Sequence, residues 1–241
     1  MDRIPTVKRT LLVLLLSAAA HAQQYPFLPV AGAPKTVRLL FEDRRGRIWT
    51  LGEELTVFDG ARFFNLRQYG LPWGDSYDVA EDASGADWIG AEQGVFRFAE
   101  GRVNQVAAGV AVSVVPISPD LALAAVGAAG KGTPHETRLV RIRRTGTKWS
   151  AETLFDLHTP GPLTADGRGN LLFPEPGRGY GELRAGRPET GVTHHPIPRF
   201  PSNGPMKVMR DRAGCLWVGA SGGVGTTAAR AFAIRSTRGL R

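Results

Sequence analysis

A seven-residue motif, Asp-x-x-Gly-x-x-Trp, recurs three times and constrains the fold more than any other feature of the chain. It occupies residues 43–49, 82–88 and 211–217. The first two copies are 39 residues apart, and the gap before the third is about three times as long. A chain of similar units with a period of roughly 40 residues is therefore expected, with two further copies between the second and the last.

Two weaker copies lie in that gap. One runs from Asp166 through Gly169 to Phe173, with Phe173 near the tryptophan position, and the other, at 118–123, lacks the glycine and the aromatic residue. The sequence thus contains about five units. The predicted structural residues of the repeat are Asp43, Gly46, Trp49, Asp82, Gly85, Trp88, Asp166, Gly169, Asp211, Gly214 and Trp217.

The chemistry of the motif predicts a tight turn between two strands. An aspartate side chain can accept hydrogen bonds from backbone N–H groups two residues further on, as Asp43 would. Glycine takes the positive φ that closes such a hairpin, which is the role expected of Gly46. Trp49, at the start of the second strand, is large enough to fill the space between two sheets, burying roughly 150–250 Å².

Each unit holds four short strand patterns. In the first, apolar stretches at 37–41, 48–51 and 55–58 precede a short fourth one at 62–64, and the Asp59-Gly60 pair between the last two favours a hairpin turn. Four strands per 40-residue unit are typical of a propeller blade. We predict an all-β fold, a β-propeller of about five four-stranded blades, whose closure into a ring is left open.

The uncharged stretch 103–119 allows an alternative, a membrane span. Its interruptions at Gly109, Pro116 and Pro119 and its β-branched residues favour buried strands instead. Residues 136–149 then fit the third and fourth strands of the third unit, with 145–147 as their turn.

The ends of the chain differ from its body. Residues 1–22 have a basic start, a ten-residue apolar stretch and a small-x-small cleavage site, which predicts a signal peptide and export to the periplasm or the outside of the cell. An uncleaved anchor is the alternative, but the apolar stretch is short for a bilayer. Residues 23–224 would form the propeller, and 225–241 an irregular basic tail.

The formal net charge of +8 raises the question of a nucleic-acid partner. The basic residues are spread along the chain, so a solvated surface and no nucleic-acid partner are expected. Cys215 is the single cysteine, which excludes an intramolecular disulfide.

A catalytic site is not apparent in the sequence. His194 and His195 are adjacent and would point to opposite sides of a strand, and His135 and His158 are isolated. The repeated aspartates are better explained as turn caps, and no histidine accompanies Cys215. The glycine-rich stretches lack phosphate-binding spacing. We therefore expect no catalytic residues, no cofactor and no metal.

Three segments carry a family resemblance: VRLLFEDRRGRIWTLG at 37–52, SYDVAEDASGADWIGAEQGVFRF at 76–98 and MKVMRDRAGCLWVGASGGV at 206–224. They resemble the two-component regulator propeller repeat, and the likeness extends over most of residues 23–224. The resemblance implies an exported sensory propeller of hybrid histidine kinase-type receptors, some of which respond to products of polysaccharide breakdown. An oligosaccharide or other small ligand, and a membrane receptor or second propeller as partner, are the expectations that follow.

The sequence departs from that family in having about five units where about seven are usual, and in lacking a kinase segment and, after signal cleavage, a transmembrane span. We expect a truncated member, a ligand-binding sensor without its own kinase. The alternative is an exported propeller enzyme resembling streptogramin lyases, which would need a histidine and acidic residues at one mouth of the channel.

Overall fold

In the computed structural model, residues 30–52, 54–128, 136–157, 161–175, 177–197, 207–220, 223–228 and 231–235 are described. Residues 34–241 belong to one compact unit, and 30–33, at the end of the preceding unit, close a turn in which the Ala33 N–H donates to the Val30 carbonyl. The predicted signal peptide, at 1–22, lies outside the described residues.

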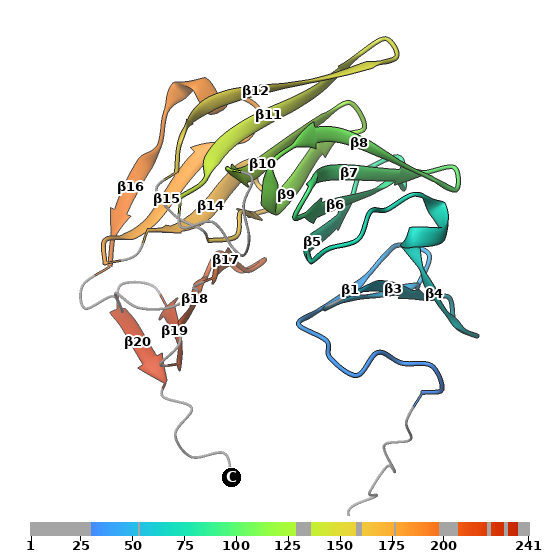
Figure 1. The fold of residues 1–241 in the computed structure, drawn as a ribbon. Coiled ribbons are helices and arrows are strands. Elements are labelled where there is room, and N and C mark those ends of the chain that lie inside the picture. Colours follow the sequence, from blue (N-terminus) through green and yellow to red (C-terminus); the bar gives the residue numbers. More distant parts are fainter. Residues whose placement is uncertain are drawn as a thin grey trace, which may run out of the picture. The chain divides into compact units, whose positions relative to one another are not determined.

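The described strands form five four-stranded antiparallel sheets, each made of four consecutive strands in chain order (Figure 1). We call these sheets blades 1 to 5, and the prediction of an all-β propeller of about five blades is confirmed. Blade 1 contains β1 (Leu39–Glu42), β2 (Ile48–Leu51), β3 (Leu55–Phe58) and β4 (Phe63–Asn65), followed by a 3-10 turn at Leu66–Tyr69; blade 2 contains β5 (Ser76–Glu81), β6 (Asp87–Ala91), β7 (Gly94–Ala99) and β8 (Arg102–Ala108).

The remaining blades follow the same order. Blade 3 contains β9 (Val110–Ser118), β10 (Leu121–Gly127), β11 (Arg138–Thr145) and β12 (Lys148–Asp156); blade 4 contains β13 (Thr164–Ala165), β14 (Asn170–Glu175), β15 (Gly179–Arg184), a 3-10 turn at Pro188–Thr190 and β16 (Thr193–Pro196); blade 5 contains β17 (Lys207–Arg210), β18 (Leu216–Ala220), β19 (Gly223–Ala228) and β20 (Ala231–Arg235).

The stretch 103–119 forms β8 and β9, so the alternative of a membrane span there is wrong. Its apolar residues are buried between blades because β9 contributes Val112 and Val115 to one core cluster and Val114 to another. Within the described part of the chain, no helix has both the length and the apolar character needed to cross a membrane.

Apolar cores lie between consecutive blades rather than inside any one of them. Trp49 and Leu51 of blade 1 pack with Ile89 and Phe96 of blade 2. Further clusters join blade 2 to blade 3, blade 3 to blade 4, and blade 4 to blade 5. Because a four-stranded sheet buries little by itself, each blade depends on its neighbours for a core.

The C-terminal segment differs from the expectation of an irregular tail at 225–241. Residues 223–228 and 231–235 pair as β19 and β20, with Ala228 opposite Ala231. The expected Asp-Gly turn is missing from this stretch, but pairing requires only backbone N–H and C=O groups, and 231–235 alternates small with large apolar residues as strands do.

Candidate functional site

In the repeated turn, the aspartate side chain is a hydrogen-bond acceptor for backbone N–H groups. Asp43 Oδ1 accepts hydrogen bonds from the N–H groups of Arg45 (2.9 Å) and Arg47 (3.0 Å). The Gly46 N–H donates to the Asp43 carbonyl at 2.9 Å, and Gly46 has a φ of 74°. The same positive φ occurs at the other motif glycines, Gly85, Gly169 and Gly214.

The second carboxylate oxygen explains why aspartate and tryptophan occur together. In three blades the indole Nε1–H donates to Oδ2 of the aspartate six residues earlier: Trp49 to Asp43 (2.8 Å), Trp88 to Asp82 (2.9 Å) and Trp217 to Asp211 (2.8 Å). This bond is not among the interactions predicted from the sequence, although the constant spacing of aspartate and tryptophan was its signal. One carboxylate therefore closes the turn and holds the tryptophan.

Blade 4 lacks the tryptophan and satisfies its aspartate differently. Asp166 Oδ2 accepts from the Asn170 side chain at 2.9 Å and from Arg210 of blade 5 at 2.7 Å. The strand register places Leu172 opposite Thr164, as Trp88 lies opposite Ala80 in blade 2. Leu172, and not Phe173, therefore occupies the tryptophan position.

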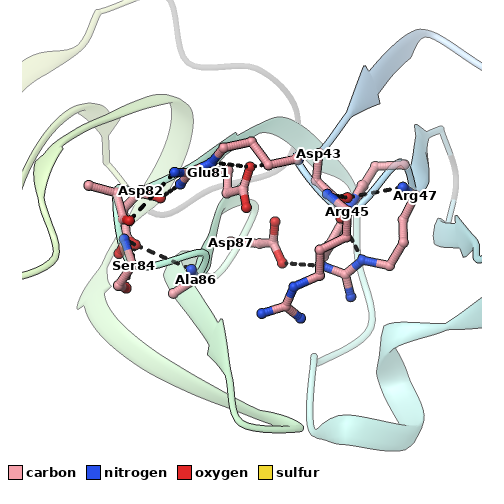
Figure 2. A network of polar contacts seen from close by, with 11 residues as sticks. Asp43, Arg45, Arg47, Glu81, Asp82, Ser84, Ala86 and Asp87 are labelled. Carbon is pink, nitrogen blue, oxygen red and sulfur yellow. Dashed lines mark hydrogen bonds and ion pairs between the residues drawn. The ribbon is translucent and has the colours of Figure 1, made fainter.

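Arginines connect the turns of neighbouring blades. Figure 2 shows Arg47 between Asp43 of blade 1, whose Oδ2 lies 2.5 Å from Nε, and Asp87 of blade 2, whose Oδ2 lies 2.9 Å from a terminal nitrogen. Arg44 donates to Glu81 Oε2 from its backbone N–H (2.9 Å) and from Nε (3.0 Å), and also contacts the Asp82 carbonyl. This network fastens blade 1 to blade 2.

The capping carboxylates are ionised in the folded protein. Burial alone would raise the pKa values of Asp43, Asp82 and Asp166, but hydrogen bonds from backbone and side-chain donors outweigh it and hold them below the ordinary value. The pKa of Asp211 is also lowered, chiefly by the Trp217 hydrogen bond. These carboxylates accept hydrogen bonds within the turns, so the geometry gives them a structural role.

Asp87 is the exception within the network. Its side chain is buried, and among the described residues Oδ1 has no hydrogen-bond partner. Burial raises its pKa to about 7, with the charges of Asp43 and Glu81 adding to the effect and Arg47 opposing it. Near neutral pH, the buried charge of ionised Asp87 therefore destabilises the contact between blades 1 and 2, which Arg47 stabilises.

We expect the Asp87→Asn variant to be about 1–3 kcal/mol more stable than the wild type at pH 8. The amide keeps an acceptor for Arg47 and removes the buried charge. Because the folded pKa lies above the unfolded one, wild-type stability falls as the pH rises from about 4 to 7, and this fall should disappear in the variant. Urea unfolding at a series of pH values measures it, with Asp120→Asn, at an exposed ion pair, as the control. An unchanged pH profile would contradict the prediction.

A second polar group links the inner strands of three blades. Asp78 of β5 accepts from the Ser113 hydroxyl (2.7 Å) and from the Val114 N–H (2.9 Å) of β9. The Ser113 oxygen in turn accepts from the Leu163 N–H (3.1 Å), just before β13. Burial raises the pKa of Asp78, and these hydrogen bonds oppose that rise. The only sequence signal was an aspartate inside a strand.

A cavity of about 520 Å³ lies between blades 3 and 4. It is lined by Phe155, Asp156, Leu157, Phe173, Glu175, Arg178, Val192 and His194. In each blade the motif turn joins the first strand to the second, whereas Glu175 and Arg178 flank the turn from the second to the third. The cavity therefore lies at the blade ends opposite the motif turns.

The cavity combines apolar walls with charged groups at its edge. Phe173 is buried, and its ring packs on Gly181. A Cβ atom at position 181 would come within 2.3 Å of the ring, so only a glycine allows Phe173 to take this place in the cavity wall. The His194 ring lies 2.8 Å (Nδ1) from Glu175 Oε1. Arg178 is exposed at the rim. Apolar walls with a few converging polar groups are the usual composition of a small-molecule site.

The histidines do not form a metal site in the described part of the chain. His194 contacts Glu175, whereas His195 stacks on Tyr180 (4.6 Å between ring centroids) and lies 3.2 Å from Glu182. Both stand on β16, the outer strand of blade 4. Among the described residues no cluster of three potential metal ligands occurs. His135 and His158 lie outside the described residues.

Comparisons with known proteins bear on the fold. No family model and no curated protein matches the chain. Among solved structures, it is similar to the extracellular domains ascribed to the hybrid two-component systems BT4673 (TM-score 0.60, 17% identity) and BT3049 (TM-score 0.59, 15% identity) of B. thetaiotaomicron. These matches cover 82% and 83% of this chain and 30% of each of those chains.

A third solved structure belongs to an enzyme. A catalytically inactive variant of virginiamycin B lyase from Staphylococcus aureus, with quinupristin, matches at a TM-score of 0.62 and 15% identity, over 87% of this chain and 72% of that one. At these identities the likeness shows the fold, and that fold occurs in sensor domains and in enzymes. The protein is a β-propeller.

Proposed function

We propose that this chain is an exported, ligand-binding sensory propeller that belongs to a two-component signalling receptor. The observation that carries the proposal is the cavity between blades 3 and 4, where Arg178 and the Glu175–His194 pair adjoin an apolar wall. The similarity to extracellular domains ascribed to two-component systems supports it. The proposed ligand is an oligosaccharide.

The site suits a hydroxylated ligand chemically. Charged side chains with exposed polar atoms hydrogen-bond sugar hydroxyls, and the partly buried Phe155 offers an apolar surface for the ring face. Because Phe155, Asp156 and Leu157 lie at the end of blade 3 and the other lining residues belong to blade 4, a bound ligand would bridge two blades. A change in the contact between these blades is then the mechanism by which binding would reach a partner.

Arg178→Ala and Glu175→Gln are each expected to weaken oligosaccharide binding at least tenfold, the loss of about one charge-assisted hydrogen bond. Isothermal titration with xylo-, cello- and galacturono-oligosaccharides of four to six units measures this. Arg143→Ala, an exposed arginine on β11 outside the cavity, is the matched control and should bind as the wild type does. If no probe binds, or if Arg143→Ala weakens binding equally, the proposed site is wrong.

The Glu175–His194 pair also favours a second candidate, a propeller-scaffold lyase, because a histidine beside a carboxylate can act as a general acid or base. His194 lies on β16, the outer strand of blade 4, whereas this candidate requires a histidine at the channel mouth. Chromatography of quinupristin incubated with the protein tests it, with His194→Ala as control. Conversion that depends on His194 would favour the enzyme.

A further inference from the structure

Among the described residues, blades 1 and 5 each have one apolar face that no other blade covers. In blade 5 this face carries Met209 and Trp217, which are 42% and 38% exposed. In blade 1 it carries Leu40, which is 66% exposed, together with the partly buried Phe58 and Phe63, whose ring centroids lie 4.9 Å apart. By contrast, the motif tryptophans of blades 1 and 2 are 0% exposed because a following blade covers them.

The contact between blades 1 and 2 shows what such a face binds. Phe98 of blade 2 meets the Trp49 ring edge-on, with 6.2 Å between centroids. Val79 of blade 2 belongs to the same core cluster, against which Phe41 of blade 1 packs. At the turn, Arg44 of blade 1 holds Glu81 of blade 2 through two hydrogen bonds.

The free face of blade 5 repeats the residues that blade 1 contributes to its contact with blade 2. Met209 lies opposite Trp217 in the register, as Phe41 lies opposite Trp49. Arg212 follows the motif aspartate directly, as Arg44 does in blade 1, and it is exposed.

The free face of blade 1 resembles the face of blade 2 that packs against blade 1. Glu42 stands one residue before the motif aspartate, as Glu81 does in blade 2, and it is exposed. Leu40 occupies the position of Val79. Phe58 lies opposite Ile48, as Phe98 lies opposite Asp87, so it matches the phenylalanine that covers Trp49.

From this match we propose that two copies of the chain associate head to tail, with blade 1 of one copy covering the Met209–Trp217 face of blade 5 of the other. Trp217 then meets Phe58 as Trp49 meets Phe98, and Arg212 pairs with Glu42 as Arg44 pairs with Glu81. The contact is heterologous, since the two copies contribute different surfaces.

The association is weaker than the blade 1–blade 2 contact. Thr50 and Thr56, whose hydroxyls lie 2.6 Å apart, replace the apolar Ile89 and Phe96 at the corresponding positions. Cys215 stands where Arg47 bridges blades 1 and 2. Less apolar area and one ion pair fewer give a reversible interface.

Sedimentation velocity of the full mature chain between about 1 and 100 µM tests the proposal, since this range covers reversible contacts of ordinary strength. The wild type should associate with increasing concentration. Leu40→Lys and Met209→Lys, each at an exposed position, should remain monomeric, with circular dichroism confirming their folding. An equimolar mixture of the two variants should form a 1:1 dimer, because each retains the face that the other has lost. Trp73→Lys, at a residue 74% exposed between blades 1 and 2, is the control and should associate like the wild type.

A charge exchange provides an independent measurement. Arg212→Glu and Glu42→Arg should each weaken association at least threefold, and mixing these two variants should restore it through the reversed pair. A wild type that stays monomeric over the whole concentration range overturns the proposal. This includes the case in which the chain itself covers the face that carries Trp217, which protection of Trp217 from iodide quenching would reveal. Equal association of Leu40→Lys and wild type, or no dimer in the mixture, overturns it as well.

Discussion

Replacing Trp88 by alanine is expected to lower the free energy of unfolding by about 3–5 kcal/mol, the range found for large aromatic residues in cores. Trp88 is 0% exposed between blades 2 and 3 and meets Trp149 edge-on, with 5.3 Å between centroids. Its Nε1–H donates to Asp82, so the substitution leaves a cavity and removes a buried donor. Equilibrium unfolding in urea, followed by far-ultraviolet circular dichroism, measures the loss.

Trp217→Ala is the matched control, because it removes the same residue from the same motif. Trp217 is 38% exposed, and among the described residues no further blade packs against it. Its loss should cost less than half as much as that of Trp88 when measured at low protein concentration, where copies do not associate. Equal costs at the two positions would contradict the view that burial between blades, and not the turn itself, makes the tryptophan important.

The second large effect is expected for Asp82→Ala, which should lower the free energy of unfolding by about 3–5 kcal/mol. Asp82 accepts backbone hydrogen bonds from Ser84 (2.8 Å) and Ala86 (3.2 Å) and pairs with Arg97 at 3.2 Å. The Arg97 side chain is only 14% exposed, so removing the carboxylate leaves a largely buried charge without its partner. Thermal and urea unfolding measure the change.

The pH dependence separates this role from simple packing. The folded pKa of Asp82 lies below its ordinary value, so its stabilisation is present above about pH 4 and is lost as the pH falls through the folded pKa. Asp82→Ala should therefore show a smaller loss of stability on acidification than the wild type. The equivalent Asp211→Ala removes a half-buried cap and should have a clearly smaller effect at neutral pH. An acid profile unchanged by Asp82→Ala would contradict the assignment.

Local chemistry made much of the fold predictable. In blades 1, 2, 4 and 5 the motif placed the hairpin turn between the first and second strands, because an aspartate cap and a glycine with positive φ act within a few residues. Prediction failed where pairing depended on partners elsewhere in the chain. The stretch 225–235 contains no Asp-Gly pair, yet residues 223–228 and 231–235 complete blade 5 because β18 provides an edge for pairing. Phe173 was placed near the tryptophan position, and the register assigns that position to Leu172.

The candidate ligand site was not predictable in the same way. Its residues come from the end of β12 and from three parts of blade 4, and they share no spacing in the sequence. Glu175 and His194 are 19 residues apart and meet because β14 and β16 flank β15. The sequence marked His194 only as one of an adjacent pair, and nothing marked Arg178.

The repeating unit of this protein, a four-stranded blade with a capped turn, follows from the sequence, because hydrogen bonding and backbone conformation within a turn are local. Tertiary structure alone decided how the units are joined. Arg47 reaches Asp87 and Arg44 reaches Glu81 across a blade boundary, 40 and 37 residues away, and the cavity is lined by residues of two blades. Such contacts depend on the distance between side chains in space. The local structure of the turns does not fix that distance.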